Sequence, residues 1–466
     1  PYTSSAASDV YKRQNIDNTV LSFTVGNDVM LDKKLVDFDC ISTAAHAHML
    51  MQLPKNNPII SKEEFNSLLI SLNKIIELNN EKKFKIKEVD QDVHMAIEKM
   101  ITKEHGELGK KLHTFRSRND QVATDLRLLA KKELIKTVDV SLSLIKSLII
   151  FAKKNKNVPM VGRTHMHPAM PSSVGLWASA HAESLLDDCN CLFSAYELND
   201  QCPLGSAASY GVPFKIDRNL TSSLLGFSKP THNVLYANNS RGKVESIILS
   251  SMSQVMLSLS RIAQDLLIFT MPEFNYFKVA DNFLTGSSIM PQKNNLDICE
   301  LIRAKSSSVK SCELAIYDIV KSAPSGYNRD LQETKQPFFE GILTTISCLE
   351  ILTSLIYTLK VNKNDMIKAF DSKVFSTDRT LELVAEGMSF RDAYNHVKNN
   401  LDDLKNIDPR EAIKNKTHLG APYGLDWSYY TVRTNQISKK LKKEKINFER
   451  KISKLLDRPY KVCLLY

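Results

Sequence analysis

Several features of secreted, membrane and disulfide-stabilised proteins are missing from the sequence. It has no apolar run of about 18 residues and no charged leader followed by an apolar stretch. The eight cysteines are scattered over 466 residues, and the spacing of Cys189 and Cys191 fits neither a zinc site nor a redox motif. These absences predict a cytoplasmic protein whose cysteines are buried free thiols.

The positive net charge does not come with a nucleic-acid-binding motif. A net charge of +10 could suit nucleic acid, but no compact basic and aromatic motif accompanies it. The densest basic run, Lys439–Lys445, is typical of the solvated face of a helix. We therefore expect neither nucleic acid nor a membrane as a partner. Residues 1–14 and 462–466 resemble translated sequencing adapter, and we expect them to be foreign to the natural protein.

Glycine and proline are rare within five long segments and gather in the connections between them. Apolar residues recur at steps of three and four along each segment, which is typical of an amphipathic helix. The first segment alone would form a rod of roughly 50 Å, because a helix rises about 1.5 Å per residue. The five segments cover residues 120–154, 172–200, 241–270, 295–321 and 338–360.

These segments predict an all-α fold, and no strand-like alternation competes with that interpretation. Helices much longer than the usual length of about 11–12 residues bury their apolar stripes against one another. The stripes are wide enough for several neighbours, so we expect the chain to oligomerise. We predict three parts: an N-terminal helical domain over residues 15–118, a central bundle of five long helices over 119–361, and a C-terminal helical domain over 362–461.

The connection Gly286–Asn295 carries the strongest chemical signal. Gly286 and Pro291 indicate a shaped loop, and the helical spacing after it places the loop at a helix N-terminus. Such an N-terminus favours an anion, and Lys293 adds a full positive charge. Two serines beside an anion suit removal of a proton next to a carboxylate. From this segment alone, a polar surface loop before a capped helix is the simpler interpretation.

A second connection, His113–Gln121, places two arginines and an amide directly before the first long segment. The planar fork of an arginine binds a carboxylate through two parallel donors, which a lysine cannot do. Taken alone, a helix cap with surface charges explains these residues equally well.

A third connection, Gly162–Pro168, contains a candidate acid or base. His165 qualifies because histidine titrates near neutral pH, although a lone histidine is more often structural. His165 and His167 could suggest a metal, but no Asp, Glu or Cys lies nearby at ligand spacing. We therefore expect no metal site here.

Two more connections add a small-residue turn and a cluster of long hydrogen-bond donors. They are Asn199–Gly211, which contains Cys202–Ser206, and Ser325–Lys335. Each alone would be a plain surface connection. A substrate with several carboxylates and an amino group needs a set of this kind.

Taken in chain order, these connections resemble the motifs of a known family. The loop at Gly286–Asn295 resembles the signature of the fumarase/aspartase superfamily, whose members release fumarate from a succinyl group. From about Phe23 to Leu456 the chain resembles the argininosuccinate lyase family, and residues 23–26 and 171–177 resemble its branch in Bacteroidetes-type bacteria. The matching stretches are His113–Leu128, Thr164–His165, Cys202–Ser206, Ser240–Arg241, Gly286–Lys305 and Tyr327–Lys335.

The resemblance implies a reaction, an assembly and residue roles. The reaction is the reversible elimination of argininosuccinate to L-arginine and fumarate, the last step of arginine biosynthesis, without a metal or an organic cofactor. The assembly is a homotetramer with a twenty-helix core, whose active sites are each built from three subunits. The implied catalytic residues are the base Ser287, the acid or acid-orienting His165, the carbanion-stabilising Lys293, and Glu300 as the carboxylate partner of His165. The implied substrate contacts are Arg118, Asn119, Thr164, Arg241, Asn295, Tyr327, Gln332 and Lys335.

The chain also departs from the family pattern at named positions. Phe115 replaces a glycine, Arg163 and His167 replace a tyrosine and a glutamine, and Asn294 and Leu296 replace a lysine and a proline. We expect Phe115 and Leu296 to change the shape of their loops. Two alternatives stay open: a sibling fumarate-releasing lyase, such as one acting on adenylosuccinate, and a non-catalytic structural homologue that keeps the fold.

Overall fold

A computed structural model of the chain describes residues 17–54 and 56–462. Most of the two segments predicted to be foreign, residues 1–14 and 463–466, lies outside the described residues. Val462 is described, and its backbone N–H donates to Glu449 Oε1 over 2.8 Å.

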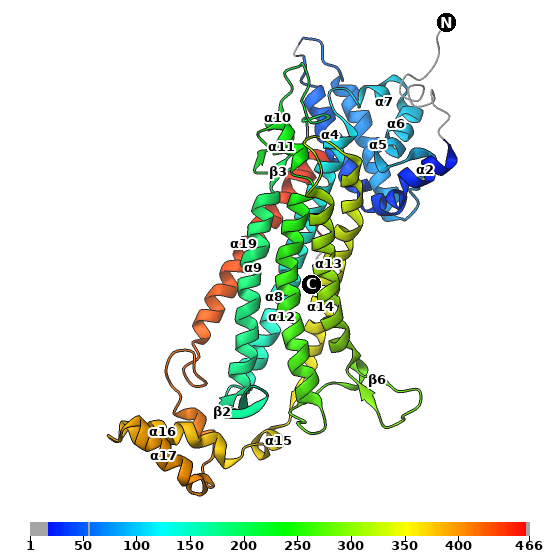
Figure 1. Cartoon of the computed structure of the whole chain (residues 1–466). Coiled ribbons are helices and arrows are strands. Elements are labelled where there is room, and N and C mark those ends of the chain that lie inside the picture. Colours follow the sequence, from blue (N-terminus) through cyan, green and yellow to red (C-terminus); the bar gives the residue numbers. More distant parts are fainter. Residues whose placement is uncertain (1–16, 55, 463–466) are drawn as a thin grey trace.

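Five long helices form the centre of the molecule, as the sequence predicts (Figure 1). The longest, α8, has 37 residues, which corresponds to a rod of about 55 Å. All five run side by side, and α8 packs along α9 and α14 while α12 packs along α9, α13 and α14. Their bounds are α8 (Arg118–Lys154), α9 (Val174–Asn199), α12 (Lys243–Thr270), α13 (Asp297–Val320) and α14 (Lys335–Thr358).

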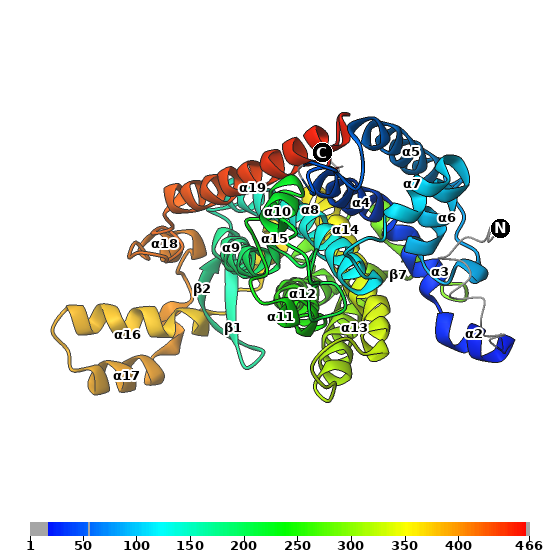
Figure 2. The same cartoon turned by 90° about the horizontal axis from the view of Figure 1, so that it is seen from above.

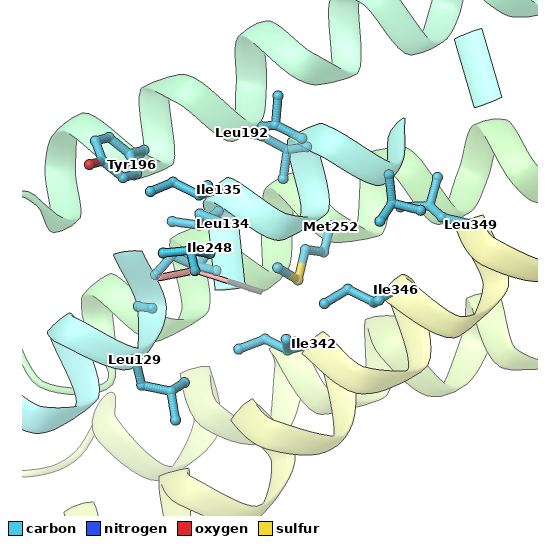
Figure 3. Packing of buried hydrophobic residues seen from close by; sticks show 14 of the residues in the cluster. Leu129, Leu134, Ile135, Leu192, Tyr196, Ile248, Met252, Ile342, Ile346 and Leu349 are labelled. Carbon is cyan, nitrogen blue, oxygen red and sulfur yellow. The ribbon is translucent and has the colours of Figure 1, made fainter. Parts of the chain in front are cut away.

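The core of this bundle consists of aliphatic side chains contributed by helices that are far apart in sequence (Figure 3). Each helix presents a stripe of residues that excludes water from the bundle axis, and this burial is the main stabilising contribution to the fold. Examples are Leu129 and Leu134 from α8, Leu192 from α9, Ile248 and Met252 from α12, and Ile342, Ile346 and Leu349 from α14.

Shorter helices cover one end of the bundle (Figure 1, blue and cyan). The helix α5 begins with a reciprocal cap: the Glu64 N–H donates to Ser61 Oγ over 3.1 Å, and the Ser61 N–H donates to Glu64 Oε2 over 2.7 Å. The elements at this end are α2 (Asn18–Val25), α3 (Asp28–Leu31), η1 (Asp32–Lys34), α4 (Val36–Leu50), α5 (Lys62–Asn80), η2 (Glu88–Asp90), α6 (Val93–His105) and α7 (Glu107–Lys111).

The connections between the long helices contain short elements. At the α2–α7 end these are β3 (Gln201–Cys202), α10 (Arg218–Leu224), β4 (Lys229–Pro230), α11 (Val234–Asn239) and η4 (Arg329–Thr334). The remaining ones are β5 (Phe277–Lys278), η3 (Asp281–Phe283), β6 (Thr285–Gly286), β7 (Asn294–Asn295) and β8 (Lys360–Val361). Within the described residues, β3 pairs with β4, β5 with β8, and β6 with β7.

One substantial hairpin was not expected from the sequence. The strands β1 (Pro159–Thr164) and β2 (His167–Ser173) pair antiparallel at the end of the bundle opposite α2–α7 (Figure 1). Its register shifts between Gly162 and Arg163. The prolines and this bulge interrupt the two-residue alternation that would mark a strand pair in the sequence.

The last part of the chain extends from the hairpin end and then returns. The elements α15 (Lys363–Lys368), η5 (Ser372–Phe375), α16 (Ser376–Ala385), α17 (Phe390–Asn399), η6 (Leu401–Leu404) and α18 (Pro409–Lys414) lie at that end, and α16 and α17 share a small core of their own. The final helix α19 (Trp427–Leu456) runs back along the outside of the bundle against α4, α8 and α9 (Figure 2). The predicted division into three domains stays a prediction.

Two stretches of the described chain are more apolar than the sequence pattern suggested. Lys243–Thr270 and Arg329–Thr358 are long and apolar enough to cross a membrane by length and composition alone, since an 18-residue window within each has a mean hydropathy of 1.2 and 1.5, respectively. Both contribute buried residues to the bundle core, and the core helix of a globular protein passes the same test.

Candidate active site

Six of the predicted substrate contacts line one cavity at the α2–α7 end of the bundle. The cavity has a volume of about 150 Å³. It forms where the N-termini of α6 and α8 meet η4 and the start of α14, so residues from distant parts of the chain converge there. The six residues are Arg118, Asn119, Arg241, Tyr327, Gln332 and Lys335. The structure therefore brings these six predicted residues together in one place, and their roles stay predictions.

Lys335 is buried and ion-paired on the wall of this cavity. Its Nζ lies 2.6 Å from Asp28 Oδ1 and 2.8 Å from Asp32 Oδ1. Burial opposes the charge of Lys335, but the two carboxylates outweigh it and raise the pKa of the ammonium. Burial raises the pKa of Asp28 to about 6, although Lys335 acts to lower it. The cavity therefore offers a cation and carboxylates side by side, which suits an amino-acid group.

Sequence reasoning missed Asp28 and Asp32. They are four residues apart, a spacing that places both on one face of a helical turn, and this was the available signal. Nothing local connects them to Lys335, which lies about 300 residues later in the chain.

The arginines of the cavity are held by neighbouring groups. Arg118 Nη1 donates to Asp92 Oδ2 over 2.7 Å, and Arg241 Nη2 donates to the Leu331 carbonyl over 3.1 Å. Arg241 is buried, and its Nε has no hydrogen-bond partner among the described residues. A buried donor of this kind favours an acceptor such as a carboxylate.

The η4 residues face the end of α2. Gln332 Nε2 donates to the Thr24 carbonyl over 3.0 Å, and Arg329 Nη2 donates to the same oxygen over 2.7 Å. Segments some 300 residues apart in sequence thus close one side of the cavity.

His94, another lining residue that the sequence did not single out, rests on a buried acidic pair. Its Nδ1 donates to Asp39 Oδ2 and lies 3.7 Å from Asp125 Oδ2. Gln121 Nε2 donates to the same Asp39 oxygen over 2.6 Å. Burial acts to lower the pKa of His94, but Asp39 and its neighbours raise it to about 9, so the imidazole is a cation at neutral pH. Among the described residues, Asp39, His94 and Asp125 form the group whose potential metal-ligand atoms all lie within 4.8 Å of one another. His94 and Asp39 are already joined by an ion pair.

Thr164 and His165 lie at the opposite end of the bundle from the cavity. Thr164 pairs with His167, so His165 and Met166 form a two-residue turn between β1 and β2. Their φ values are +51° and +65°, as a type I′ turn requires, although Asn-Gly is the usual sequence there. The turn exposes the His165 ring, which lines a wider hollow between β1, α9 and α12. A strained turn that exposes a histidine is consistent with a functional role.

The loop between β6 and β7 carries Ser287 and Lys293, and Glu300 follows in the first turn of α13. The Met290 N–H donates to Ser287 Oγ over 3.0 Å, and the Ile289 N–H reaches the same oxygen over 3.4 Å. Donors aimed at the hydroxyl oxygen favour its deprotonated form. Lys293 and Glu300 are exposed, and no described hydrogen bond or ion pair joins Glu300 to His165.

A single chain does not bring the cavity, the His165 turn and the Ser287 loop together. Arg241 lies two residues before the start of α12, and the Ser287 loop follows the other end of that helix. A helix of 28 residues spans about 40 Å. Figure 1 shows β6 projecting near the end opposite α2–α7. The catalytic roles implied for Ser287, His165 and Lys293 stay predictions.

The departures from the family pattern make contacts of their own. Phe115 adopts a φ of +64°, a conformation natural for the glycine it replaces, and its ring stacks on Phe214. Arg163 places its guanidinium 4.7 Å from the centre of the Phe274 ring. Leu296 is buried in the core next to the first turn of α13, whereas His167 and Asn294 are exposed. None of the five replaces a residue of the cavity.

The chain is a lyase, and its fold is of the fumarase/aspartase type. Residues 8–310 match the model of a family described as lyase. Among solved structures, EDDS lyase in complex with formate has a TM-score of 0.81, with 21% identity over 94% of both chains. The class II fumarase of Schistosoma mansoni has a TM-score of 0.68, with 16% identity over 84% of this chain and 94% of that one.

Curated relatives narrow the assignment. The argininosuccinate lyase of Thermotoga neapolitana is 39% identical over 83% of this chain and 96% of its own length. That of Parabacteroides distasonis is 38% identical over 88% of this chain and 91% of its own, which confirms the predicted likeness to Bacteroidetes-type members. The chain belongs to the argininosuccinate lyase family.

Proposed function

We propose that the chain catalyses the reversible elimination of argininosuccinate to L-arginine and fumarate, the last step of arginine biosynthesis. The observation that carries this proposal is the cavity at the α2–α7 end. It combines the carboxylate-binding Arg118 and Arg241 with the buried Lys335–Asp28 pair, and argininosuccinate has three carboxylates and an amino group to fill such a site.

Ser287 is the proposed base. The alkoxide of its side chain takes the proton from the succinyl carbon next to a carboxylate, and the resulting carbanion is delocalised as a dianionic carboxylate. Lys293 and Asn295 stabilise that charge by ion pairing and hydrogen bonding. The electron pair then expels the guanidino nitrogen as the C–N bond breaks, and the nitrogen receives a proton. His165, with Glu300 as its carboxylate partner, supplies or orients that proton. This chemistry uses the chain's own side chains, and we expect it to need no resident metal or organic cofactor.

The active enzyme is proposed to be a homotetramer with a twenty-helix core. The separation of Arg241 from the Ser287 loop along α12 supports this assembly, because a second copy lying antiparallel brings its hairpin end to the cavity of the first. Exposed apolar residues on the long helices supply a surface for that contact, among them Leu257, Leu301, Leu314, Tyr317 and Leu343. We propose that the tetramer is cytoplasmic and that it acts without nucleic acid or a membrane as a partner.

The test is fumarate release by the purified protein. We expect release from argininosuccinate and none from adenylosuccinate in a parallel assay. Release from adenylosuccinate alone would favour the sibling lyase, and a well-folded tetramer inactive on both substrates would favour the structural homologue. Light scattering checks the assembly, since a monomeric mass under assay conditions contradicts the shared site.

A further inference from the structure

Phe115 has an unusual backbone conformation for an aromatic residue. Its φ of +64° lies in the left-handed region, where the Cβ of an L-residue crowds the following carbonyl. The residue stands two positions before Ser117, the N-cap of α8, and three before Arg118. A conformation this costly persists only where the surrounding contacts fix it.

The contact that fixes Phe115 is a ring stack with Phe214. The ring centres are 4.5 Å apart and the planes are inclined by 17°. Phe214 belongs to the segment that follows the small-residue turn at Cys202–Ser206, so the stack joins two connections that are about 100 residues apart. Stacked aromatic pairs stabilise a fold by more than the hydrophobic contribution of the area that they bury.

Asp120 joins the same two connections a second time. Its Oδ2 accepts hydrogen bonds from the backbone N–H groups of Gly205 and Ala207, both over 2.8 Å. Its Oδ1 accepts from the N–H of Ser117 over 2.9 Å. The carboxyl is fully buried, so these three bonds satisfy a group that would otherwise be costly to bury.

Arg118 and Asn119 therefore lie between two anchors on the 205–214 segment. Phe115 is the anchor before them and Asp120 the anchor after them. On the opposite side, Arg116 Nη1 donates to Thr43 Oγ1 over 3.0 Å and ties the segment to α4. Because the backbone is held on both sides, the Cα atoms of Arg118 and Asn119 are held in place, and their side chains line the cavity.

We infer that Phe115 is a positioning residue for Arg118 and Asn119, and that it acts through its stack on Phe214. This inference rests on the proposed function, because those two side chains are taken to bind the substrate. Phe115 does not line the cavity, so its loss should change binding more than proton transfer.

The experiment measures KM and kcat for argininosuccinate in Phe115→Leu, Phe214→Leu and the double variant. We expect KM to rise about three- to tenfold in each single variant, as the value of an aromatic pair implies, with kcat within about twofold of wild type. The double variant should match the single ones instead of multiplying their effects, because both remove one contact. Phe115→Tyr and Phe214→Tyr keep the rings and should restore the wild-type KM.

Two controls separate positioning from general stability. Phe370→Leu removes a ring from the remote Phe370–Phe375 stack and should leave KM unchanged. Lys82→Gly relieves another left-handed residue far from the cavity and should also leave KM unchanged. If a Phe115 variant does not fold, Phe214→Leu still tests the inference, because Phe214 is 41% exposed and lies outside the buried core. A wild-type KM in Phe214→Leu, or KM effects that multiply in the double variant, overturns the inference. Absence of fumarate release by the wild-type protein overturns the proposed function instead.

Discussion

The cavity at the α2–α7 end and the loop between β6 and β7 are built in opposite ways. In the cavity, the proposed binding residues are held by partners from distant segments, such as Lys335 between Asp28 and Asp32, or Gln332 against Thr24. The loop is exposed, and among the described residues the Ser287 hydroxyl accepts hydrogen bonds from Ile289 and Met290 of the same loop. The proposed binding groups are thus ordered before a substrate arrives, whereas the proposed base is held by hydrogen bonds within its own loop.

This difference follows from what each region has to do. A binding site gains affinity when its side chains are already fixed, because ordering them on binding costs conformational entropy. A base that removes a carbon-bound proton works best in a site closed to water, and a loop can close over the substrate after it binds. The chain places the ordered part where its own helices converge, and in the proposed tetramer the loop meets the cavity of another copy.

The largest expected effect is the loss of turnover in Ser287→Ala. The change removes the proposed base, so kcat should fall by roughly 10²–10⁴, the usual contribution of a positioned acid or base. The loop contributes little to the core, so the melting temperature and the tetrameric mass should stay at wild-type values. Steady-state fumarate release and a thermal melt measure both. A melting temperature that falls with activity would show that the loop contributes to the stability of the helical core.

Complementation between two inactive variants gives the next largest effect. Arg118→Ala disables the cavity of a chain and Ser287→Ala disables its loop. If each site takes its cavity and its loop from different chains, a random one-to-one mixture should recover roughly a quarter of wild-type activity. The measurement is fumarate release after the mixed chains are dissociated and reassembled, with each variant treated alone as the control. No recovery in reassembled tetramers would place both groups of one site in a single chain.

A smaller effect concerns the stability of the cavity end as pH changes. The pKa of His94 is about 9 in the folded chain against an ordinary value of about 6.5, so the fold favours the protonated ring. The resulting stabilisation is complete below pH 6.5 or so and is lost as pH rises through 9. The loss should be roughly 3 kcal/mol, because one pKa unit corresponds to about 1.4 kcal/mol.

Chemical denaturation at intervals between pH 6 and pH 9.5 measures this slope. His94→Gln cannot titrate and should lose the slope, although it is less stable throughout because Asp39 and Asp125 remain buried beside it. An equal slope in the variant would assign the pH dependence to other groups.

The sequence predicted the bundle well because local periodicity determines it. The five predicted long segments match α8, α9, α12, α13 and α14 to within a few residues at each end. The reciprocal cap at Ser61 and Glu64 is equally local, since it depends on residues only three positions apart.

The missed features depend on contacts between distant residues or on broken local rules. Asp28 and Lys335 meet only after the chain folds, and no pattern within either segment announces the other. The hairpin at His165 was missed because its turn has no Asn-Gly and its strands contain prolines. Six residues of the cavity could be predicted as substrate contacts only through the family resemblance, because no local pattern marks them as neighbours.

The smallest expected effect belongs to Ser288→Ala, the matched control for Ser287→Ala. Ser288 is exposed, and no hydrogen bond of its side chain occurs in the described part of the chain, whereas Ser287 Oγ accepts from two backbone N–H groups. Those donors favour an alkoxide at Ser287, and no such donors are described for the Ser288 hydroxyl. We therefore expect kcat in Ser288→Ala to stay within about twofold of wild type. Both variants are compared in the same fumarate assay and at the same tetramer concentration. If Ser288→Ala abolishes turnover while Ser287→Ala keeps it, the base is Ser288. The loop would then have to turn its second serine toward the substrate as it closes, and the hydrogen bonds to Ser287 Oγ would be a structural cap of the open loop.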